Sequence, residues 1–227
     1  MSAGKLKTQL LRVVDAYLTP LGFQRVSNRF HGDRYYREDA GVRQCIHVSA
    51  VARGDVLEAE LPYISVRFNA VEEMVATLED PHPLLTPADV AVRATLTVPT
   101  SSSGGFVRKK WMIRSADDVA GAADQIANYA IEKGMPAFQA LSSSEQALAI
   151  LSADDERARS YSAPDEVRAE KAVSLAFLLH GQDAAKQIAN AKLGRLRGEG
   201  LSTFTHWMDR FLQSSVKEQG STDPSSA

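Results

Sequence analysis

The apolar residues of this chain change their spacing along its length, and this change limits the folds available to it. Over residues 6–21 they recur every three to four positions, which indicates one amphipathic helix. Between residues 23 and 68 the spacing falls to about two, as in strands with one face more buried than the other. Helical spacing returns after Ser115 and continues to about Gln213. The chain is therefore predicted to be an α+β protein.

The strand region contains four runs joined by short turns, at residues 23–30, 34–38, 42–51 and 56–68. Strands connected in this way predict an antiparallel meander sheet. Pro62 cannot donate a backbone hydrogen bond, so it marks an edge, a bulge or a break in the last run. A short helix at residues 69–78 follows, and residues 90–98 and 106–114 are further strand candidates. The predicted sheet thus has about five or six strands.

The helical half carries start and stop signals. Ser115 is a predicted N-cap, followed by two aspartates in the first turn, where the helix dipole favours negative charge. Gly134 and Pro136 are predicted to end that helix, and Gly181 to end a later one. Three apolar residues of the later helices are predicted to lie in the core, namely Phe177, Leu178 and Trp207.

These patterns predict a division of the chain into three parts. Residues 1–140 form an α+β sheet domain, and residues 141–214 form a helical extension packed on it or beside it. Residues 215–227 are small and polar, so we expect a disordered tail.

Composition indicates an ordinary globular protein, with 44% hydrophobic and 24% charged residues. The net charge of -2 argues against a protein dominated by nucleic-acid binding, although residues 1–114 carry +3 and residues 115–227 carry -5. The single cysteine, Cys45, excludes an intrachain disulfide and fits a reducing compartment. The sequence has neither the apolar core of a signal peptide nor a run of about 18 apolar residues. We therefore expect a cytoplasmic protein with no membrane partner.

Few residue patterns point to chemistry. The five histidines are widely spaced, and one cysteine cannot build a thiolate site, so no metal is expected. Cys45 and His47 share a strand face, which makes a Cys–His pair conceivable, but such a cysteine is more often a small buried hydrophobe. No glycine-rich phosphate loop is present. We expect no catalytic residues, no cofactor and no enzyme activity.

Arginines and aromatic residues crowd the first strands, where they form a possible interaction surface: Arg25, Arg29, Arg34, Tyr35, Tyr36, Arg37 and Arg43. Such a set suits a recognition surface, and its tyrosines could stack on bases. A half-exposed sheet produces the same pattern when its rings pack inward and its arginines are solvated. The second interpretation is favoured.

Several of these segments occur together in a recognisable order: "LTPLGFQRVSNRF", "QCIHVSA", "WMIRSADDV" and a helix that ends in "EKGMP". Over roughly residues 6–140 the chain resembles an uncharacterised bacterial domain family with the pattern L-x-x-x-G-F-x-[KR] after a leading helix and a strand with Gln and Ser. The resemblance implies an α+β fold and assigns no catalytic residue. Similar small domains serve as immunity or accessory proteins of bacterial toxin systems, which by analogy implies a protein partner.

Three functional hypotheses follow. The leading one is a non-enzymatic cytoplasmic protein-interaction module of immunity or accessory type. The first alternative is a nucleic-acid-associated protein that uses the basic hairpin around residues 25–43. The second is an enzyme with a site at the junction of sheet and helices.

Overall fold

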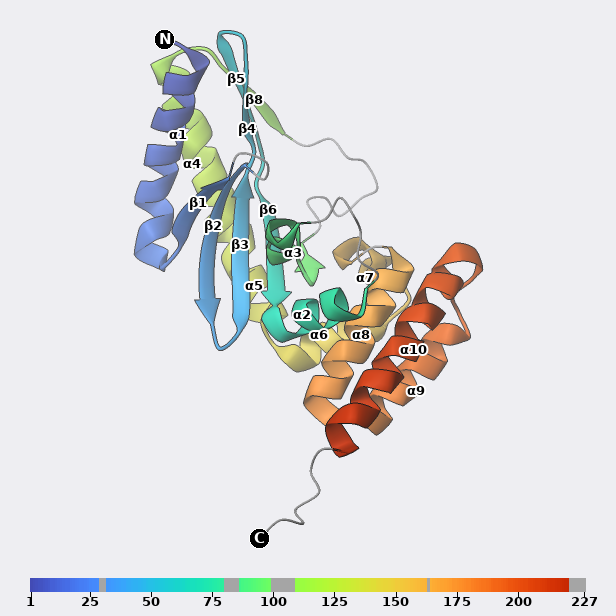
Figure 1. Ribbon diagram of the computed structural model, residues 1–227. Coiled ribbons are helices and arrows are strands. Elements are labelled where there is room, and N and C mark those ends of the chain that lie inside the picture. Colours follow the sequence, from blue (N-terminus) through green and yellow to red (C-terminus); the bar gives the residue numbers. More distant parts are fainter. Residues whose placement is uncertain (29–31, 80–85, 99–108, 163, 221–227) are drawn as a thin grey trace. The chain divides into compact units, whose positions relative to one another are not determined.

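A computed structural model describes residues 1–28, 32–79, 86–98, 109–162 and 164–220 (Figure 1). It confirms the predicted α+β class, with a leading helix, antiparallel strands and a helical second half. The chain forms two compact units, which differ from the predicted division in one segment. The sheet unit comprises Met1–Arg67 and Leu96–Ser142, and the helical unit comprises Phe68–Thr95 and Ser143–Ala227.

The sheet unit begins with helix α1 (Ala3–Leu18), which buries one apolar stripe, as its spacing predicts: Ala3, Leu6, Leu10, Leu11, Val14 and Leu18. A single 3₁₀ turn, η1 (Thr19–Leu21), follows. Gly22 then adopts a φ of 85°, a left-handed conformation that favours glycine, and the chain leaves the helix. Phe23 comes next and is buried, with its ring centroid 5.7 Å from that of Phe138.

The strands form two sheets, whereas the spacing predicts one meander. Five strands lie in the order β1-β2-β3-β6-β7, and three lie in the order β4-β5-β8. Only Ser49 separates β3 from β4, and only Leu61 and Pro62 separate β5 from β6. Proline has no N–H to donate, so the predicted break at Pro62 is where the strand divides. The strands are β1 (Gln24–Asn28), β2 (Gly32–Asp39), β3 (Val42–Val48), β4 (Ala50–Arg53), β5 (Val56–Glu60), β6 (Tyr63–Phe68), β7 (Leu96–Thr97) and β8 (Lys110–Ile113).

Two of the later predictions are wrong in part. Most of the strand predicted at residues 90–98 is replaced by helix α3 (Pro87–Ala91) and a turn, which leaves only the short β7. Thr86 and Asp89 cap the start of α3 reciprocally, so local capping overrides the alternating pattern. The strand predicted at residues 106–114 is shorter as β8, and its residues 106–108 lie outside the described residues.

Helix α4 (Ala116–Tyr129) begins at the predicted N-cap, where Ser115 and Asp118 form a capping box. Its predicted end at Gly134 and Pro136 is wrong, because a π-helical turn, η2 (Ala130–Gly134), leads directly into α5 (Met135–Leu141). A π turn changes the hydrogen-bond register and so accommodates a proline without a break. Gly134 packs closely there, since a Cβ would lie 3.1 Å from Cδ1 of Ile64 and would require that side chain to shift.

The helical unit is built from seven helices within the part of the chain that is described: α2 (Asn69–Leu78), α3, α6 (Ser144–Ser152), α7 (Glu156–Tyr161), α8 (Asp165–His180), α9 (Gln182–Leu193) and α10 (Gly198–Gly220). Gly181, with a φ of 82°, ends α8 as predicted. Helix α10 includes residues 215–220, for which composition predicts disorder. The predicted tail beyond Gly220 lies outside the described residues. No helix of the described chain is long and apolar enough to cross a membrane.

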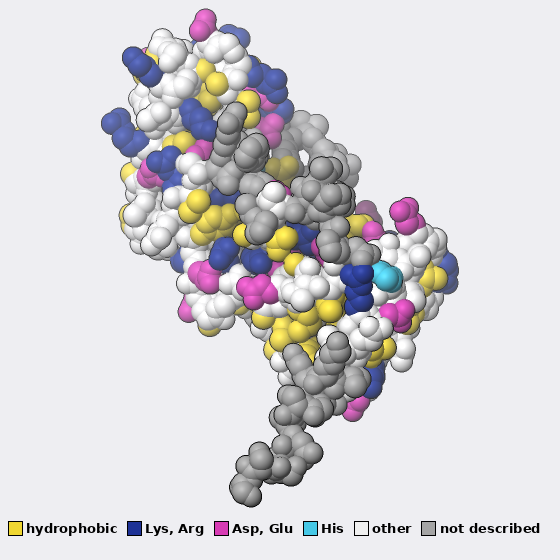
Figure 2. All heavy atoms as spheres, in the orientation of Figure 1, with side chains coloured by type: hydrophobic (Ala, Val, Ile, Leu, Met, Phe, Trp, Pro, Cys, Tyr) yellow, Lys and Arg dark blue, Asp and Glu magenta, His cyan; other side chains and the backbone are white. Residues whose placement is uncertain are grey.

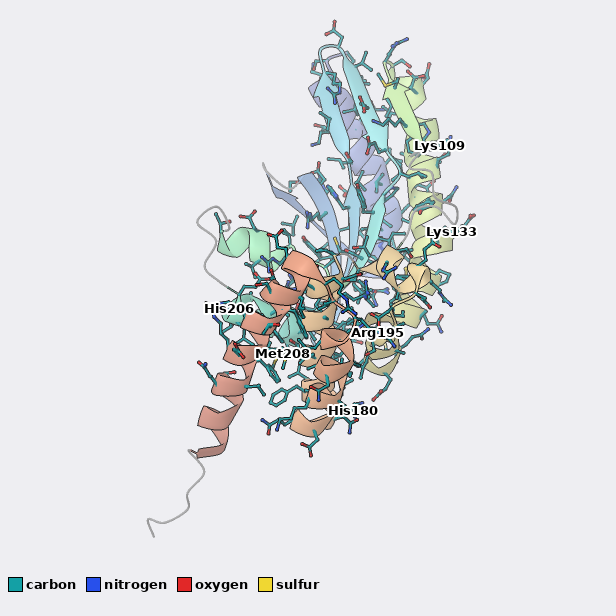
Figure 3. The ribbon with its side chains drawn as sticks, turned by 90° about the vertical axis from the view of Figure 1, so that its right-hand side faces the viewer. Lys109, Lys133, His180, Arg195, His206 and Met208 are labelled. Atoms are coloured by element: carbon teal, nitrogen blue, oxygen red, sulfur yellow. The ribbon has the colours of Figure 1, made fainter. Side chains whose placement is uncertain are left out.

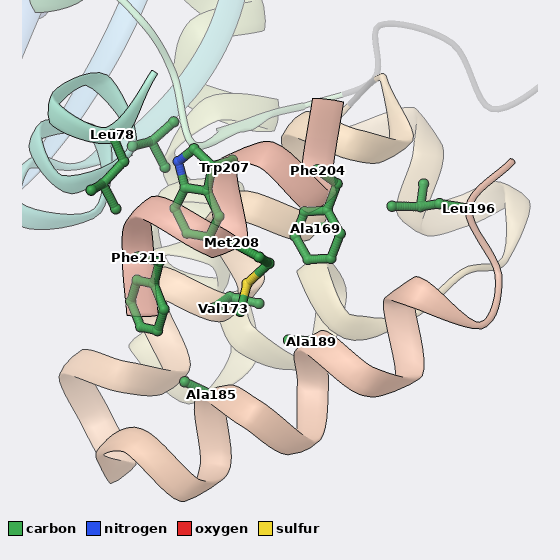
Figure 4. Close-up of a cluster of buried hydrophobic side chains, with 11 residues drawn as sticks. Leu78, Ala169, Val173, Ala185, Ala189, Leu196, Phe204, Trp207, Met208 and Phe211 are labelled. Carbon is green, nitrogen blue, oxygen red and sulfur yellow. The ribbon is translucent and has the colours of Figure 1, made fainter. Parts of the chain in front are cut away.

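The core of the helical unit gathers around α8 and α10 (Figure 4). Trp207 is buried as predicted and stacks on Phe204 and Phe211, with ring centroids 6.2 Å and 5.5 Å away. Phe177 is only partly buried, with its ring edge against Phe211. The core prediction for Leu178 is wrong, because this side chain is 44% exposed near the end of α8.

Candidate functional site

The interaction surface predicted on the first strands is divided by the pleat of the sheet. Residues directly opposite each other in an antiparallel pair share a face, and neighbours along a strand alternate. Arg25 lies opposite Tyr35, and Tyr35 lies opposite Ile46, so these three residues share one face, here called the helix-packed face, which contacts α1 through Tyr35. Arg34 and Tyr36 point to the other face. The predicted residues therefore do not form one surface.

On the helix-packed face, Arg25 and Tyr35 take part in internal contacts. Arg25 Nε lies 3.1 Å from Asp15 Oδ1 of α1, and its Nη1 lies 3.9 Å from Asp33 Oδ1. Tyr35 is fully buried and donates its hydroxyl to Asp15 Oδ1 at 2.8 Å. Burial, followed by this hydrogen bond to a carboxylate, raises the pKa of Tyr35 far above its ordinary value. These two residues connect β1 and β2 to α1 within the fold.

Arg37 also has a structural role. Its Nε and Nη2 both donate to Oε1 of Gln44, at 2.9 Å and 2.6 Å, and its Nη1 donates to the carbonyl oxygen of Leu21. Its guanidinium carbon lies 4.9 Å above the ring centroid of Phe23, within reach of a cation–π contact. Arg37 therefore fixes the junction between η1 and the sheet.

The opposite face carries the remaining predicted residues that are described. Its members, here called the polar sheet face, are Val26, Arg34, Tyr36, Arg43, His47 and Tyr63. Arg34 forms a hydrogen bond with the Tyr36 side chain, and Arg43 lies with its guanidinium carbon 5.4 Å from the Tyr36 ring centroid. His47 and Tyr63 stack with ring centroids 5.8 Å apart. These side chains are partly exposed, and Val26 is 52% exposed.

The polar sheet face includes three residues that were not part of the predicted interaction surface, Val26, His47 and Tyr63. His47 reaches it from β3 and Tyr63 from β6; the sequence had suggested His47 only as a conceivable partner of Cys45, and Tyr63 only as a strand residue. The Arg–aromatic crowding of residues 25–43 drew attention to the hairpin, but Tyr63 lies 20 residues beyond that segment in the sequence. Arg29, which belongs to the predicted surface, lies outside the described residues.

Cys45 lies on the same strand as His47, on the same face, but its thiol is buried. Burial raises the pKa of Cys45 to about 11, against smaller opposing effects from Arg34 and from hydrogen bonds with Ser65 and Tyr36. A thiol with a raised pKa is a weak nucleophile at neutral pH. The ring of His47 instead stacks on Tyr63. This geometry favours the interpretation of Cys45 as a small core residue.

Metal binding finds no support in the described part of the chain. No cluster of three or more His, Cys, Asp or Glu side chains there could hold a metal ion. His180 ends α8 and His206 lies in α10, and the two are well separated in Figure 3. His31 and His82 lie outside the described residues.

The helical unit contains a compact cluster of charges around Asp154. Lys192 Nζ donates to Asp154 Oδ1 at 2.5 Å and to the carbonyl oxygen of Ser152, the last residue of α6, at 2.8 Å. Arg168 and Arg195 contact the same carboxylate, and Arg195 is labelled in Figure 3. Burial acts to raise the pKa of Asp154, but the hydrogen bonds from the three cations outweigh it and lower this pKa. The last carbonyl groups of a helix have no hydrogen-bond partner within it, and a lysine can supply one. Lys192 does this for α6, so the cluster has a structural role at the C-terminus of that helix.

A second charged group lies between α2, α8 and the segment before β7. Lys171 Nζ lies 3.2 Å from Glu72 Oε1, and Thr95 Oγ1 donates to the same oxygen at 2.8 Å. Lys171 also donates to the carbonyl oxygen of Ala94 at 2.6 Å. Glu72 is fully buried and Lys171 is nearly so, so both side chains are shielded from solvent. This group is a structural ion pair.

Comparison with known proteins identifies no family for this chain. No family model matches the chain, and comparison with curated proteins and with solved structures finds no match.

Proposed function

We propose that this protein is a non-enzymatic protein-interaction module, and that the polar sheet face contacts a partner with acidic groups. The observation that carries the proposal is the grouping of Arg34, Arg43 and three aromatic rings on the face opposite to the helix-packed one. Arginine and tyrosine are enriched in protein interfaces, where they supply both apolar area and hydrogen bonds.

The side chains of this face are held by one another, which lowers the entropy lost on binding. Tyr36 lies between Arg34, with which it forms a hydrogen bond, and Arg43. Arg43 Nε donates to Glu38 Oε2 at 2.8 Å, and the stacked pair of His47 and Tyr63 stands beside them on β3 and β6. A surface whose side chains are ordered in this way is suited to specific recognition of one partner rather than to nonspecific electrostatic binding.

A protein partner is favoured over a nucleic acid by the distribution of the cations. Of the basic residues predicted on the hairpin, Arg25 and Arg37 are engaged inside the fold, so fewer cations remain to neutralise phosphates. On the face seen in Figure 2, Lys and Arg side chains alternate with acidic and hydrophobic ones and do not merge into one large basic patch. That face therefore offers no continuous basic surface to a polyanion.

The class of partner rests on the resemblance of residues 6–140 to an uncharacterised bacterial domain family, because similar small α+β domains serve as immunity or accessory proteins of toxin systems. By that analogy the partner is a toxin or another component of a toxin system. Acidic side chains on the partner would complement Arg34 and Arg43 of the polar sheet face.

The test is affinity purification from the native host with the intact chain and with an Arg34→Ala, Arg43→Ala variant. A stoichiometric protein partner should co-purify, and its affinity measured by calorimetry should fall about 10- to 100-fold in the variant, because central arginines are frequent hot spots. Arg53→Ala is the matched control, since Arg53 is 66% exposed on β4 of the other sheet.

Two results would contradict the proposal. An unchanged partner affinity in the double variant would remove the polar sheet face from recognition. Co-purified RNA, released by salt and lost in the double variant, would support the nucleic-acid alternative instead.

A further inference from the structure

Strand β1 is an open edge of the five-stranded sheet. Within the described residues it pairs with β2 on one side and has no strand on the other. Four consecutive residues, Gln24, Arg25, Val26 and Ser27, are exposed although they alternate between the two faces. Val26 has one of the most exposed large apolar side chains, at 52%. The unpaired backbone groups of such an edge can accept another strand.

This edge lacks the usual protection against pairing. Strand β1 contains no proline and no lysine, and its five residues pair with β2 in continuous register without a bulge. Its one charged residue, Arg25, is held on the helix-packed face by Asp15 and Asp33. The edges of the three-stranded sheet differ, because Arg53 on β4 and Lys110 on β8 have side chains that are 66% and 51% exposed.

We propose that a second copy of this chain pairs with β1 through its own β1, in antiparallel orientation about a two-fold axis at Val26. This symmetry places Val26 opposite Val26 of the second copy, Arg25 opposite Ser27, and Gln24 opposite Asn28. No like charges face each other directly, and the exposed valine gains a cross-strand apolar partner. The β1 sequence is therefore complementary to itself.

The dimer joins the two five-stranded sheets into one and places two polar sheet faces next to each other. A partner with two binding sites would then gain avidity without any new type of contact. The dimer itself does not depend on the proposed partner, because it uses the strand edge and not the arginines of the polar sheet face. Failure of one proposal leaves the other intact.

The test combines sedimentation velocity with charge substitutions at Val26. The intact chain should shift with concentration from 24.7 kDa towards twice that mass. Val26→Lys should weaken dimer formation at least tenfold, because two like charges would face each other across the axis. An equimolar mixture of Val26→Lys and Val26→Glu should restore the dimer. Val51→Lys is the matched control, since Val51 is 49% exposed on the β4 edge, and it should dimerise like the intact chain.

Circular dichroism serves as the folding control for each variant. Because the substituted positions are exposed, we expect every variant to give the spectrum of the intact chain. An intact chain that remains monomeric up to about 1 mM, where association would be worth only about 4 kcal/mol, would overturn the proposal. A dimer that survives Val26→Lys, or that is lost in Val51→Lys, would also overturn it, because the contact would then lie elsewhere.

Discussion

Replacement of Lys171 by methionine should lower the free energy of unfolding of the helical unit by about 3–5 kcal/mol. The substitution keeps much of the side-chain volume but leaves Glu72 fully buried without its cation. One carboxylate oxygen, Oε2 of Glu72, already has no hydrogen-bond partner, so the remaining negative charge would depend on Thr95. An uncompensated buried charge is costly because the interior cannot replace the lost hydration.

Urea denaturation followed by circular dichroism measures this effect, and two further variants make it specific. Lys186→Met removes an exposed lysine of α9 and should change stability by less than about 0.5 kcal/mol. Adding Glu72→Gln to Lys171→Met should recover a large part of the loss, because neither of these two positions then holds a buried charge. A loss of stability that the second substitution does not reduce would show that Lys171 acts through packing or through the carbonyl of Ala94.

Replacement of Glu170 by glutamine should stabilise the protein at pH 8 by roughly 4 kcal/mol and by less than about 1 kcal/mol near pH 5. Glu170 lies in the middle of α8 and is only 3% exposed. Burial, followed by the negative charges of Glu79 and Glu166, raises its pKa from 4.5 to about 8, while Lys171 and Arg93 oppose this shift. Glutamine has nearly the same shape and carries no charge at any pH.

The direction of the pH dependence follows from proton counting. Between about pH 4.5 and pH 8 the folded protein holds a proton on Glu170 that the unfolded chain has lost. This group therefore reduces stability as the pH rises through that window, by up to about 1.4 kcal/mol per pH unit, and adds no further change above pH 8. Other groups titrate too, so the relevant quantity is the difference between the intact chain and the variant.

Unfolding free energies of both proteins from pH 5 to pH 9 provide the test. Their difference should grow with pH and level off near pH 8. Glu73→Gln, an exposed position on α2, is the control and should give a small, constant difference. A difference for Glu170→Gln that stays flat across the range would mean that Glu170 is ionised in the folded protein at pH 5 already.

Local sequence signals were enough for several elements of the fold. The predicted helix at residues 69–78 corresponds to α2, and Ser115 and Gly181 mark the ends of helices where capping chemistry places them. The α+β class follows from the change of apolar spacing alone. These features depend on contacts between residues a few positions apart, so the sequence contains the information directly.

The candidate site was predicted only in part, for a physical reason. Alternation along β2 separates Arg34 and Tyr36 from Tyr35 and Arg37, but it does not say which of the two faces packs against helices. Tertiary packing decides this, because α1 provides Asp15 to Tyr35 and Arg25, and η1 offers the carbonyl of Leu21 to Arg37. The crowding of arginines was visible in the sequence, but their division into structural and surface roles was not.

The sequence by itself therefore determined the class of the fold, the start and end of several helices, and the presence of a basic, aromatic hairpin. Only the tertiary structure decided that the strands divide into two sheets, that Tyr63 joins His47, and that Glu72 meets Lys171. These contacts join residues far apart in the chain, and their stability comes from burial and pairing that exist only once the units have folded. Apolar spacing and capping residues reflect contacts between residues a few positions apart. They therefore cannot specify which distant residue pairs with a buried charge or joins a given face of a sheet.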